Sequence, residues 1–471
     1  MSAPHSDVAR QVGVVALLTV YVILLLGIPT RLVFAPLGSA GAPSLVFGLF
    51  CAFAWFLAQL WRTTNEPGAR RPIRFALACF LVCVGISFTL AMTRPIEPDE
   101  ISQADVALIT CLSMAGVLLV AHDGLVHLRD IDTILRRFSM AGGLMATLGL
   151  AQYVTKQLIV DRLSIPGLRA NGVADVAFRN GLVRISGTAT SPIELGALLT
   201  MLFPIALHCA LHQRDIGRFR RWFPVLTVFA ALALSGSRSA YVAIAIVFVV
   251  LMIGWPNRLR WTAGPLAIVG AILMGLLLPP LYRSVRSMFV TAQDDPSIAS
   301  RTDSYALASQ FFARWPVFGR GLGTFLPKYR IFDNEYLGLL VSVGIVGTAA
   351  FAGILVTAIV LLFRRRRFWA DERSRDRALA LAASIAAGSA SIAFFDGFGF
   401  PMTMGTLFLL LGIAGAYVNQ RGRSPVPEES WGRVAAALPA RTVETSVGPT
   451  VPAQRSPSLA NDTLSPGAPA T

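Results

Sequence analysis

The chain has 471 residues, of which 54% are hydrophobic and only 14% are charged, and its formal net charge is +15. Soluble domains carry roughly 25% charged residues, so the composition excludes a chain built only of ordinary soluble domains. The basic residues lie in short segments between apolar blocks and form no separate basic domain. Membrane topology explains this placement better than nucleic-acid binding, and we expect no nucleic-acid partner.

Apolar blocks of about 17–25 residues recur along the chain, and this length spans a bilayer as a helix. They predict an all-α, polytopic integral membrane protein with about 12 transmembrane helices. The first block is too long for a cleavable signal peptide, and further blocks follow it. In chain order the expected spans are roughly 12–30, 44–61, 73–92, 104–121, 135–155, 192–211, 221–236, 238–255, 263–281, 334–363, 378–396 and 400–419.

Arginine clusters in the short loops set the expected orientation. They follow each even-numbered span up to the tenth, as Arg70 and Arg71 follow the second and Arg364 and Arg365 follow the tenth. Because arginine-rich short loops stay in the cytoplasm, we expect these loops and both termini there. The abundance of Ala, and of Arg over Lys, is typical of GC-rich bacterial genomes. We therefore expect a multi-pass protein of the bacterial inner (cytoplasmic) membrane.

This orientation leaves two long loops on the extracytoplasmic face, at about 156–191 and about 282–333. Within the second loop, the apolar spacing of RTDSYALASQFFARWPVFG predicts an amphipathic helix, and GRGLG predicts a tight turn. We expect one transmembrane domain over 1–420. The segment 421–471 is rich in Pro, Ser, Thr and Ala, and we expect a disordered cytoplasmic tail.

The cysteines and histidines show no spacing typical of a metal site or a disulfide framework. All five cysteines fall in apolar blocks, where they behave as small hydrophobic residues. In the expected topology, no histidine lies on the extracytoplasmic face. We expect neither a metal ion nor another cofactor.

Ionisable residues at the ends of spans are the candidate functional residues. Glu194 opens the sixth span, Arg238 the eighth, and Asp333 and Glu335 the tenth, while Asp396 closes the eleventh. All lie at the outer ends of their helices in the expected topology. Helix capping and contact with interfacial water are the alternatives, because Asp333 suits an N-cap and Glu335 the positive end of a helix. Their gathering on one face, with arginines from both long loops, favours a site.

These residue types suit one reaction in particular. Arginine fits a diphosphate because its planar fork donates paired hydrogen bonds. A carboxylate can take the proton of an incoming hydroxyl, while guanidinium groups stabilise charge on the departing diphosphate. The pattern predicts transfer of a glycan from a polyprenyl-diphosphate carrier to an acceptor hydroxyl on the extracytoplasmic face. The expected partners are that donor, a glycan or lipid-glycan acceptor, and membrane lipids.

Four segments resemble motifs of the O-antigen ligase and O-antigen polymerase-like membrane glycosyltransferases, in the family's order and spacing. They are RISGTATSPIELGALLTMLFPIAL from Arg184, SGSRSAYVA from Ser235, ARWPVFGRGLGTF from Ala313 and DNEYLGLLVSVGIVG from Asp333. The resemblance implies a bundle of about twelve transmembrane helices. It also implies a polyprenyl-diphosphate donor, no metal ion, and chemistry that faces away from the cytoplasm.

The resemblance implies roles in diphosphate binding for Arg184, Arg238 and Arg301. Where the family's fourth motif has His before Asn, this chain has Asp333. Asp333 is therefore the first candidate for a catalytic base, followed by Glu194 and Glu335. Because of this difference, a ligase, a polymerase and a cell-wall glycan transferase all remain open. The sugar, the acceptor and the oligomeric state are not predicted.

Two other functions fit part of the sequence. A transporter or flippase for lipid-linked glycans would place charge near the bilayer midplane, often on broken helices in paired halves. Here the charge lies at the outer ends of the spans, and no internal repeat is evident. A membrane scaffold would leave the outer arginines unconstrained and the carboxylates dispensable.

Overall fold

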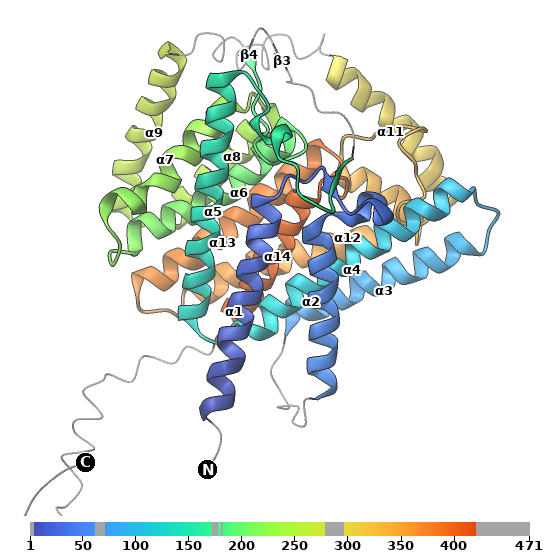
Figure 1. The fold of residues 1–471 in the computed structure, drawn as a ribbon, viewed down its shortest axis with the longest axis horizontal. Helices are drawn as coiled ribbons and strands as arrows, with labels where there is room; N and C mark the ends of the chain where they lie inside the picture. Colours follow the sequence, from blue (N-terminus) through green and yellow to red (C-terminus); the bar gives the residue numbers. More distant parts are fainter. Residues whose placement is uncertain (1–3, 62–70, 172–177, 180–181, 278–295, 421–471) are drawn as a thin grey trace, which may run out of the picture. The chain divides into compact units, whose positions relative to one another are not determined.

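The structure is a computed structural model, and it describes residues 4–61, 71–171, 178–179, 182–277 and 296–420. Within these ranges the chain is almost entirely helical, which confirms the all-α expectation (Figure 1). Each expected span coincides with a helix, and one further helix occupies the place of the expected amphipathic helix in the second long loop.

Helices make up most of the described chain, and the strands are only two residues long. In chain order the helices are α1 (Pro4–Gly27), α2 (Pro43–Leu60), α3 (Pro72–Met92), α4 (Pro98–Gly124), α5 (Leu128–Thr155), α6 (Pro192–His212), α7 (Arg218–Leu234), α8 (Arg238–Gly254), α9 (Asn257–Leu277), α11 (Pro296–Arg314), α12 (Glu335–Arg366), α13 (Glu372–Ser391) and α14 (Pro401–Asn419). Short 3-10 helices are η1 (Ala35–Gly41), η2 (Ile159–Arg162) and η3 (Ile392–Phe394). Strand β1 (Leu32–Val33) pairs antiparallel with β2 (Arg169–Ala170), and β3 (Phe178–Arg179) with β4 (Leu182–Val183).

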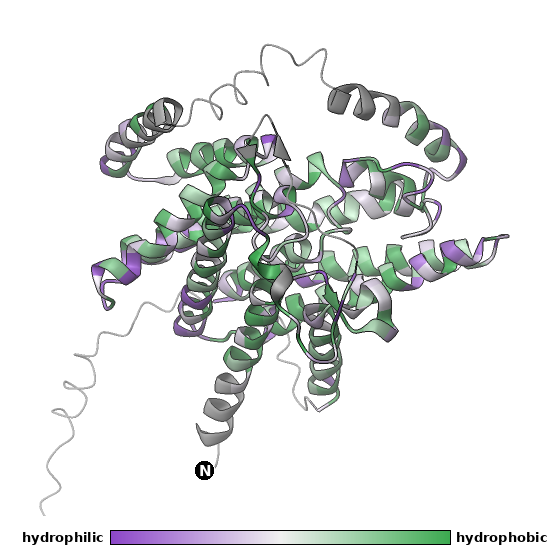
Figure 2. Ribbon diagram, turned by 45° about the horizontal axis from the view of Figure 1, so that its top comes forward, coloured by the Kyte–Doolittle hydropathy of each residue, from purple (hydrophilic) through white to green (hydrophobic). Residues whose placement is uncertain are grey.

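Seven of the described helices are long and apolar enough to cross a membrane: α2, α3, α4, α6, α12, α13 with η3, and α14. Two shorter apolar stretches are Gly13–Gly27 within α1 and Arg238–Gly254, which is α8. The expected count of about 12 spans is therefore not confirmed. Large apolar side chains such as Phe53 (58% exposed) and Phe75 (71% exposed) lie on the surface. Figure 2 shows that hydrophobic residues dominate most of the helices, and exposed apolar side chains suit contact with lipid.

Helix α14 is the central helix of the bundle. Nearly all of its residues are buried, and it contacts α4, α6, α12 and α13 (Figure 1). Polar side chains link neighbouring helices: the Ser384 hydroxyl donates to the Met201 carbonyl at 2.7 Å, and the Tyr417 hydroxyl to the Ser374 carbonyl at 2.8 Å. Such bonds between helices add to close packing where the surroundings are apolar.

Local sequence explains where many helices begin. Proline occupies the first turn of α2, α3, α4, α6 and α14, where its fixed φ suits a helix and its missing N–H leaves no unpaired donor. Side chains cap two starts that matter below. The Ser191 hydroxyl accepts the N–H of Glu194 at α6, and the Asn334 amide oxygen accepts the N–H of Leu337 at α12.

Helix α12 is broken at Gly344, which has a φ of 68° and a ψ of −172°. The segment that contains the GRGLG turn fills the break. The N–H of Arg320 donates to the Val341 carbonyl at 2.8 Å, and the N–H of Ile345 donates to the Pro316 carbonyl at 2.9 Å. Because the loop bonds the groups that the break leaves open, non-helical backbone is tolerated inside the bundle.

Gly344→Ala is expected to destabilise the protein by about 1–3 kcal/mol through backbone strain. The added Cβ would also clash with the carbonyl oxygen of Val317. Thermal unfolding of the detergent-solubilised protein measures the effect. Gly353→Ala in the same helix is the matched control, because no atom lies within 4 Å of its added Cβ. Equal unfolding temperatures for the two variants would contradict the role given to the break.

Two expectations fall on residues that the structure does not describe. The disordered tail and its boundary with the domain concern 421–471, and the start of the second long loop concerns 278–295. Both stay predictions.

Candidate active site

A cavity of about 290 Å³ lies where α12 begins. Its walls come from α2, α4, the segment between α11 and α12, and the start of α14. The polar residues that line it include Arg330, Asn334, Glu335 and Asp396. The volume is at the small end of the range for ligand pockets, so the cavity suits one reacting group rather than a whole glycan.

Asp333 lies between two residues that line this cavity, Phe332 and Asn334. The expectation that Asp333 could cap α12 is wrong, because Asn334 is the cap and accepts the N–H of Leu337 at 3.3 Å. Asp333 instead has a φ of 48°, a left-handed conformation that is uncommon outside glycine. A strained, half-buried carboxyl that capping does not occupy is a candidate for function.

Glu335 is buried in the first turn of α12. Its Oε2 accepts the backbone N–H of Phe398 at 3.1 Å, and its carboxyl contacts that of Asp396. Sequence reasoning placed both acids at the outer ends of spans but did not pair them, because only the turn before α14 brings them together.

Glu194 holds the starts of two helices together. Its side chain is fully buried, and its Oε2 accepts the N–H of Thr190 at 2.7 Å. Its Oε1 accepts the N–H of Met402 at 3.0 Å, which ties α6 to α14 beside the cavity. Both carboxyl oxygens are thus engaged by backbone donors, so Glu194 ranks behind Asp333 as a candidate base.

The Arg184 side chain packs against the turn that leads to Arg238. Its Nε donates to the carbonyl of Ser235 at 3.3 Å, and its side chain packs over Gly236, where an added Cβ would lie 3.5 Å away. Gly236 has a φ of 59°, and Arg238 is the first residue of α8. Two segments that the sequence connects only through the resemblance are therefore in contact in the structure.

Two arginines of the second long loop, Arg301 and Arg330, also bear on the site. Arg301 lies in α11, but its side chain is outside the described side chains, so its role stays a prediction. Arg330 lines the cavity, and its Nε donates to the Ser304 hydroxyl at 2.8 Å. Sequence reasoning gave Arg330 no role, because nothing in its spacing separates it from neighbouring arginines.

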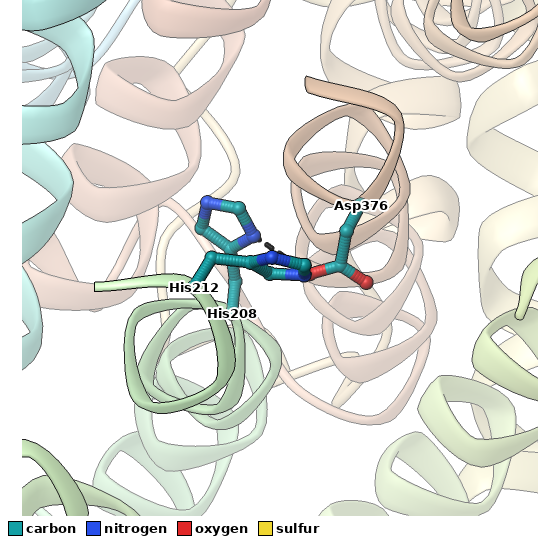
Figure 3. A group of neighbouring side chains, drawn as sticks. All are labelled: His208, His212 and Asp376. Carbon is teal, nitrogen blue, oxygen red and sulfur yellow. Dashed lines mark hydrogen bonds and ion pairs between the residues drawn. The ribbon is translucent and has the colours of Figure 1, made fainter. Parts of the chain in front are cut away.

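A group of side chains that could hold a metal ion lies at the other end of α6 (Figure 3). His208 Nδ1 and His212 Nε2 lie 2.7 and 3.2 Å from Oδ2 of Asp376 in α13. The second oxygen of Asp376 accepts the indole N–H of Trp255 at 3.0 Å. The adjacent cavity is lined by two arginines and two carboxylates, so its lining carries no excess of either charge. We interpret the group as a polar bridge between α6 and α13, away from the cavity at α12.

Comparison with known families bears on the site directly. Residues 223–352 match the family model described as O-antigen ligase. The match includes Arg238, Asp333 and Glu335, whereas Arg184 and Glu194 lie before it. No curated protein matches the chain. The match confirms the resemblance found in the sequence and supports a role in O-antigen ligation or polymerisation during surface polysaccharide biosynthesis. Over residues 223–352 the chain is thus similar to the O-antigen ligase family, and seven of its described helices are long and apolar enough to cross a membrane.

Proposed function

We propose that this protein is a glycosyltransferase that moves a glycan from a polyprenyl-diphosphate carrier to an acceptor hydroxyl. The reaction takes place on the extracytoplasmic face of the bacterial inner membrane, with both termini in the cytoplasm. The observation that carries the proposal is the contact of Arg184 with the turn before Arg238, together with a cavity at the start of α12 that is lined by carboxyl groups. This chemistry needs no cofactor.

Four helices begin close to one another at this end of the bundle: α6, α8, α12 and α14. Glu194 in α6 bonds to Met402 in α14, and Glu335 in α12 bonds to Phe398 just before α14. The first turns of α6 pack against the residue before α8. Because a helix N-terminus carries partial positive charge, four of them together favour an anionic group such as a diphosphate.

The transfer follows from these groups. A carboxylate takes the proton of the acceptor hydroxyl while the oxygen of that hydroxyl attacks the anomeric carbon of the donor. A new carbon–oxygen bond forms, and the bond from the anomeric carbon to the diphosphate oxygen breaks. The electron pair leaves with the carrier diphosphate, where Arg184 and Arg238 stabilise the developing charge.

The proposal gives the remaining candidates separate roles. Asp333 is the proposed base, and the Glu335–Asp396 pair is the second choice because it adjoins the same cavity. Glu194 acts as a positioning residue, since it fixes the starts of α6 and α14. Arg301 is proposed as a further diphosphate ligand on the strength of the resemblance alone.

Deletion of the gene tests the proposed function and separates its variants. We expect lipid-linked glycan to accumulate on the outer leaflet. Single repeat units without long polymer would identify a polymerase, and finished polymer still on its carrier would identify a ligase. Intermediates trapped on the inner leaflet would instead favour a flippase and contradict the proposal. Complementation with the wild-type gene is the control.

A further inference from the structure

A second group of arginines lies beside the cavity described above, and the proposed transfer does not use it. Arg94, Arg314 and Arg320 line a separate cavity of about 660 Å³, together with Trp315 and Tyr329. The two cavities are neighbours, because the segment that carries Arg320 and Tyr329 also contributes residues to the first cavity. No carboxylate lines this second cavity in the described part of the chain.

One buried carboxylate forms ion pairs with this group of arginines. Glu100 pairs with Arg320, lies 3.6 Å from Arg94, and accepts the hydroxyl of Tyr329 at 2.8 Å. A single negative charge cannot balance three guanidinium groups, Arg314 included. The nearby acids at positions 97 and 99 are engaged by a lysine on the surface. The cavity therefore keeps an excess of positive charge.

Two of the guanidinium groups also have N–H donors that make no hydrogen bond within the described residues. The Nε atoms of Arg94 and Arg320 are buried and have no hydrogen-bond partner among the residues that the structure describes. Buried donors are nearly always bonded, and an unbonded one is unfavourable. Burial also lowers the pKa of the Arg94 guanidinium, and the charge of Arg320 adds to this effect. An anion in the cavity would supply the missing negative charge.

Aromatic rings hold the arginines in place. The guanidinium carbons of Arg94 and Arg314 lie 5.3 and 4.9 Å from the ring centroid of Trp315. Arg320 lies 5.4 Å from the ring of Phe311 and 5.3 Å from that of Tyr329. Stacking of this kind fixes the plane of a guanidinium, so its paired donors are oriented before a ligand arrives.

We propose that Arg94, Arg314 and Arg320 form a subsite for a phosphate-class oxyanion carried by a lipid. It is distinct from the diphosphate site assigned to Arg184 and Arg238. Fixed guanidinium forks suit phosphate oxygens, and a tryptophan such as Trp315 is favoured where lipid headgroups meet water. The proposal rests on the proposed function only in taking a lipid-linked glycan as the source of that oxyanion.

Binding of farnesyl diphosphate to the full chain in phosphatidylcholine nanodiscs tests the subsite without requiring activity. We expect two binding phases, of which Arg238→Ala removes one. Arg94→Gln and Arg314→Gln should each weaken the other by about ten- to a hundred-fold, because each removes hydrogen bonds to a charged group. Arg314 is exposed at the end of α11, so its variant is expected to fold. Arg169→Gln, an exposed arginine in β2, is the matched control.

The outcomes separate this proposal from the proposed function. If Arg238→Ala removes neither phase, that result counts against the donor site and leaves the subsite standing. Binding that Arg94→Gln and Arg314→Gln leave unchanged would overturn the subsite. Displacement of the probe by inorganic diphosphate would support recognition of the oxyanion itself. Suppression of this phase by phosphatidylglycerol in the nanodisc would assign the site to a phospholipid headgroup and overturn the link to a lipid-linked glycan.

Discussion

Arg184→Ala and Arg238→Ala are each expected to reduce glycan transfer by about 10²- to 10³-fold while the protein still inserts into the membrane. The Arg184 side chain contacts the α7–α8 turn that leads into Arg238, and the donor diphosphate is proposed to bind there. Removing one guanidinium leaves the departing diphosphate without its paired donors. The measurement is transfer from a radiolabelled polyprenyl-diphosphate glycan by protein in liposomes.

Two further variants sharpen this prediction. Arg238→Lys keeps the charge but loses the planar fork, so it should also lose most of the activity if bidentate contact matters. Arg220→Ala is the matched control, because this exposed arginine lies at the opposite end of α7 from the turn. Near-normal transfer by both Arg184→Ala and Arg238→Ala would remove the diphosphate site from these residues.

Asp333→Asn is expected to lower transfer by about 10²- to 10⁴-fold, the effect of losing a general base. This substitution isolates the role of the carboxylate, because asparagine, like aspartate, tolerates the left-handed φ of 48° found at this position. The backbone at the start of α12 should therefore be kept, and only the ability to accept a proton is lost. Transfer kinetics and thermal unfolding are measured on the same preparations.

Asp333→Gly separates chemistry from backbone strain. Glycine adopts a positive φ freely, so this variant should be as stable as the wild type or more stable, yet still inactive. If both Asp333 variants retain transfer, the base lies elsewhere, and Glu335→Gln and Asp396→Asn become the deciding pair. Asn334→Ala is the control for capping, because it should lower stability without removing the carboxyl group.

The helices could be predicted from the sequence, and the reasons are local. An apolar run long enough to span a bilayer must bond its backbone internally, which leaves a helix as the simplest solution. Prolines mark five starts, Ser191 also caps one of these, α6, and Asn334 caps a sixth start, that of α12. The number of spans was less secure, because α7 and α8 are only 17 residues long and length alone does not decide them.

The candidate site was predicted only in part. The motifs indicated Arg184, Arg238 and Asp333 because their neighbours resemble a family, and residue type suggested their chemistry. The capping role considered for Asp333 was wrong by one residue, since Asn334 reaches the N–H of Leu337. Arg314 and Arg320 lie in the third motif, but their grouping around Trp315 was missed because Arg94 comes from the turn before α4, and no local pattern joins it to that motif.

By itself, the sequence determined that this protein is helical and apolar, which segments form its helices, and which residue types could bind a diphosphate. Those properties depend on neighbours within a few turns. Only the tertiary structure decided that Gly344 breaks α12 and that a distant loop fills the break, that Glu194 joins α6 to α14, and that Glu335 meets Asp396. Each of these features depends on contact between segments far apart in the chain. Hydrophobic periodicity cannot specify such contacts, because it indicates which face of a helix is buried but not which helix packs against that face.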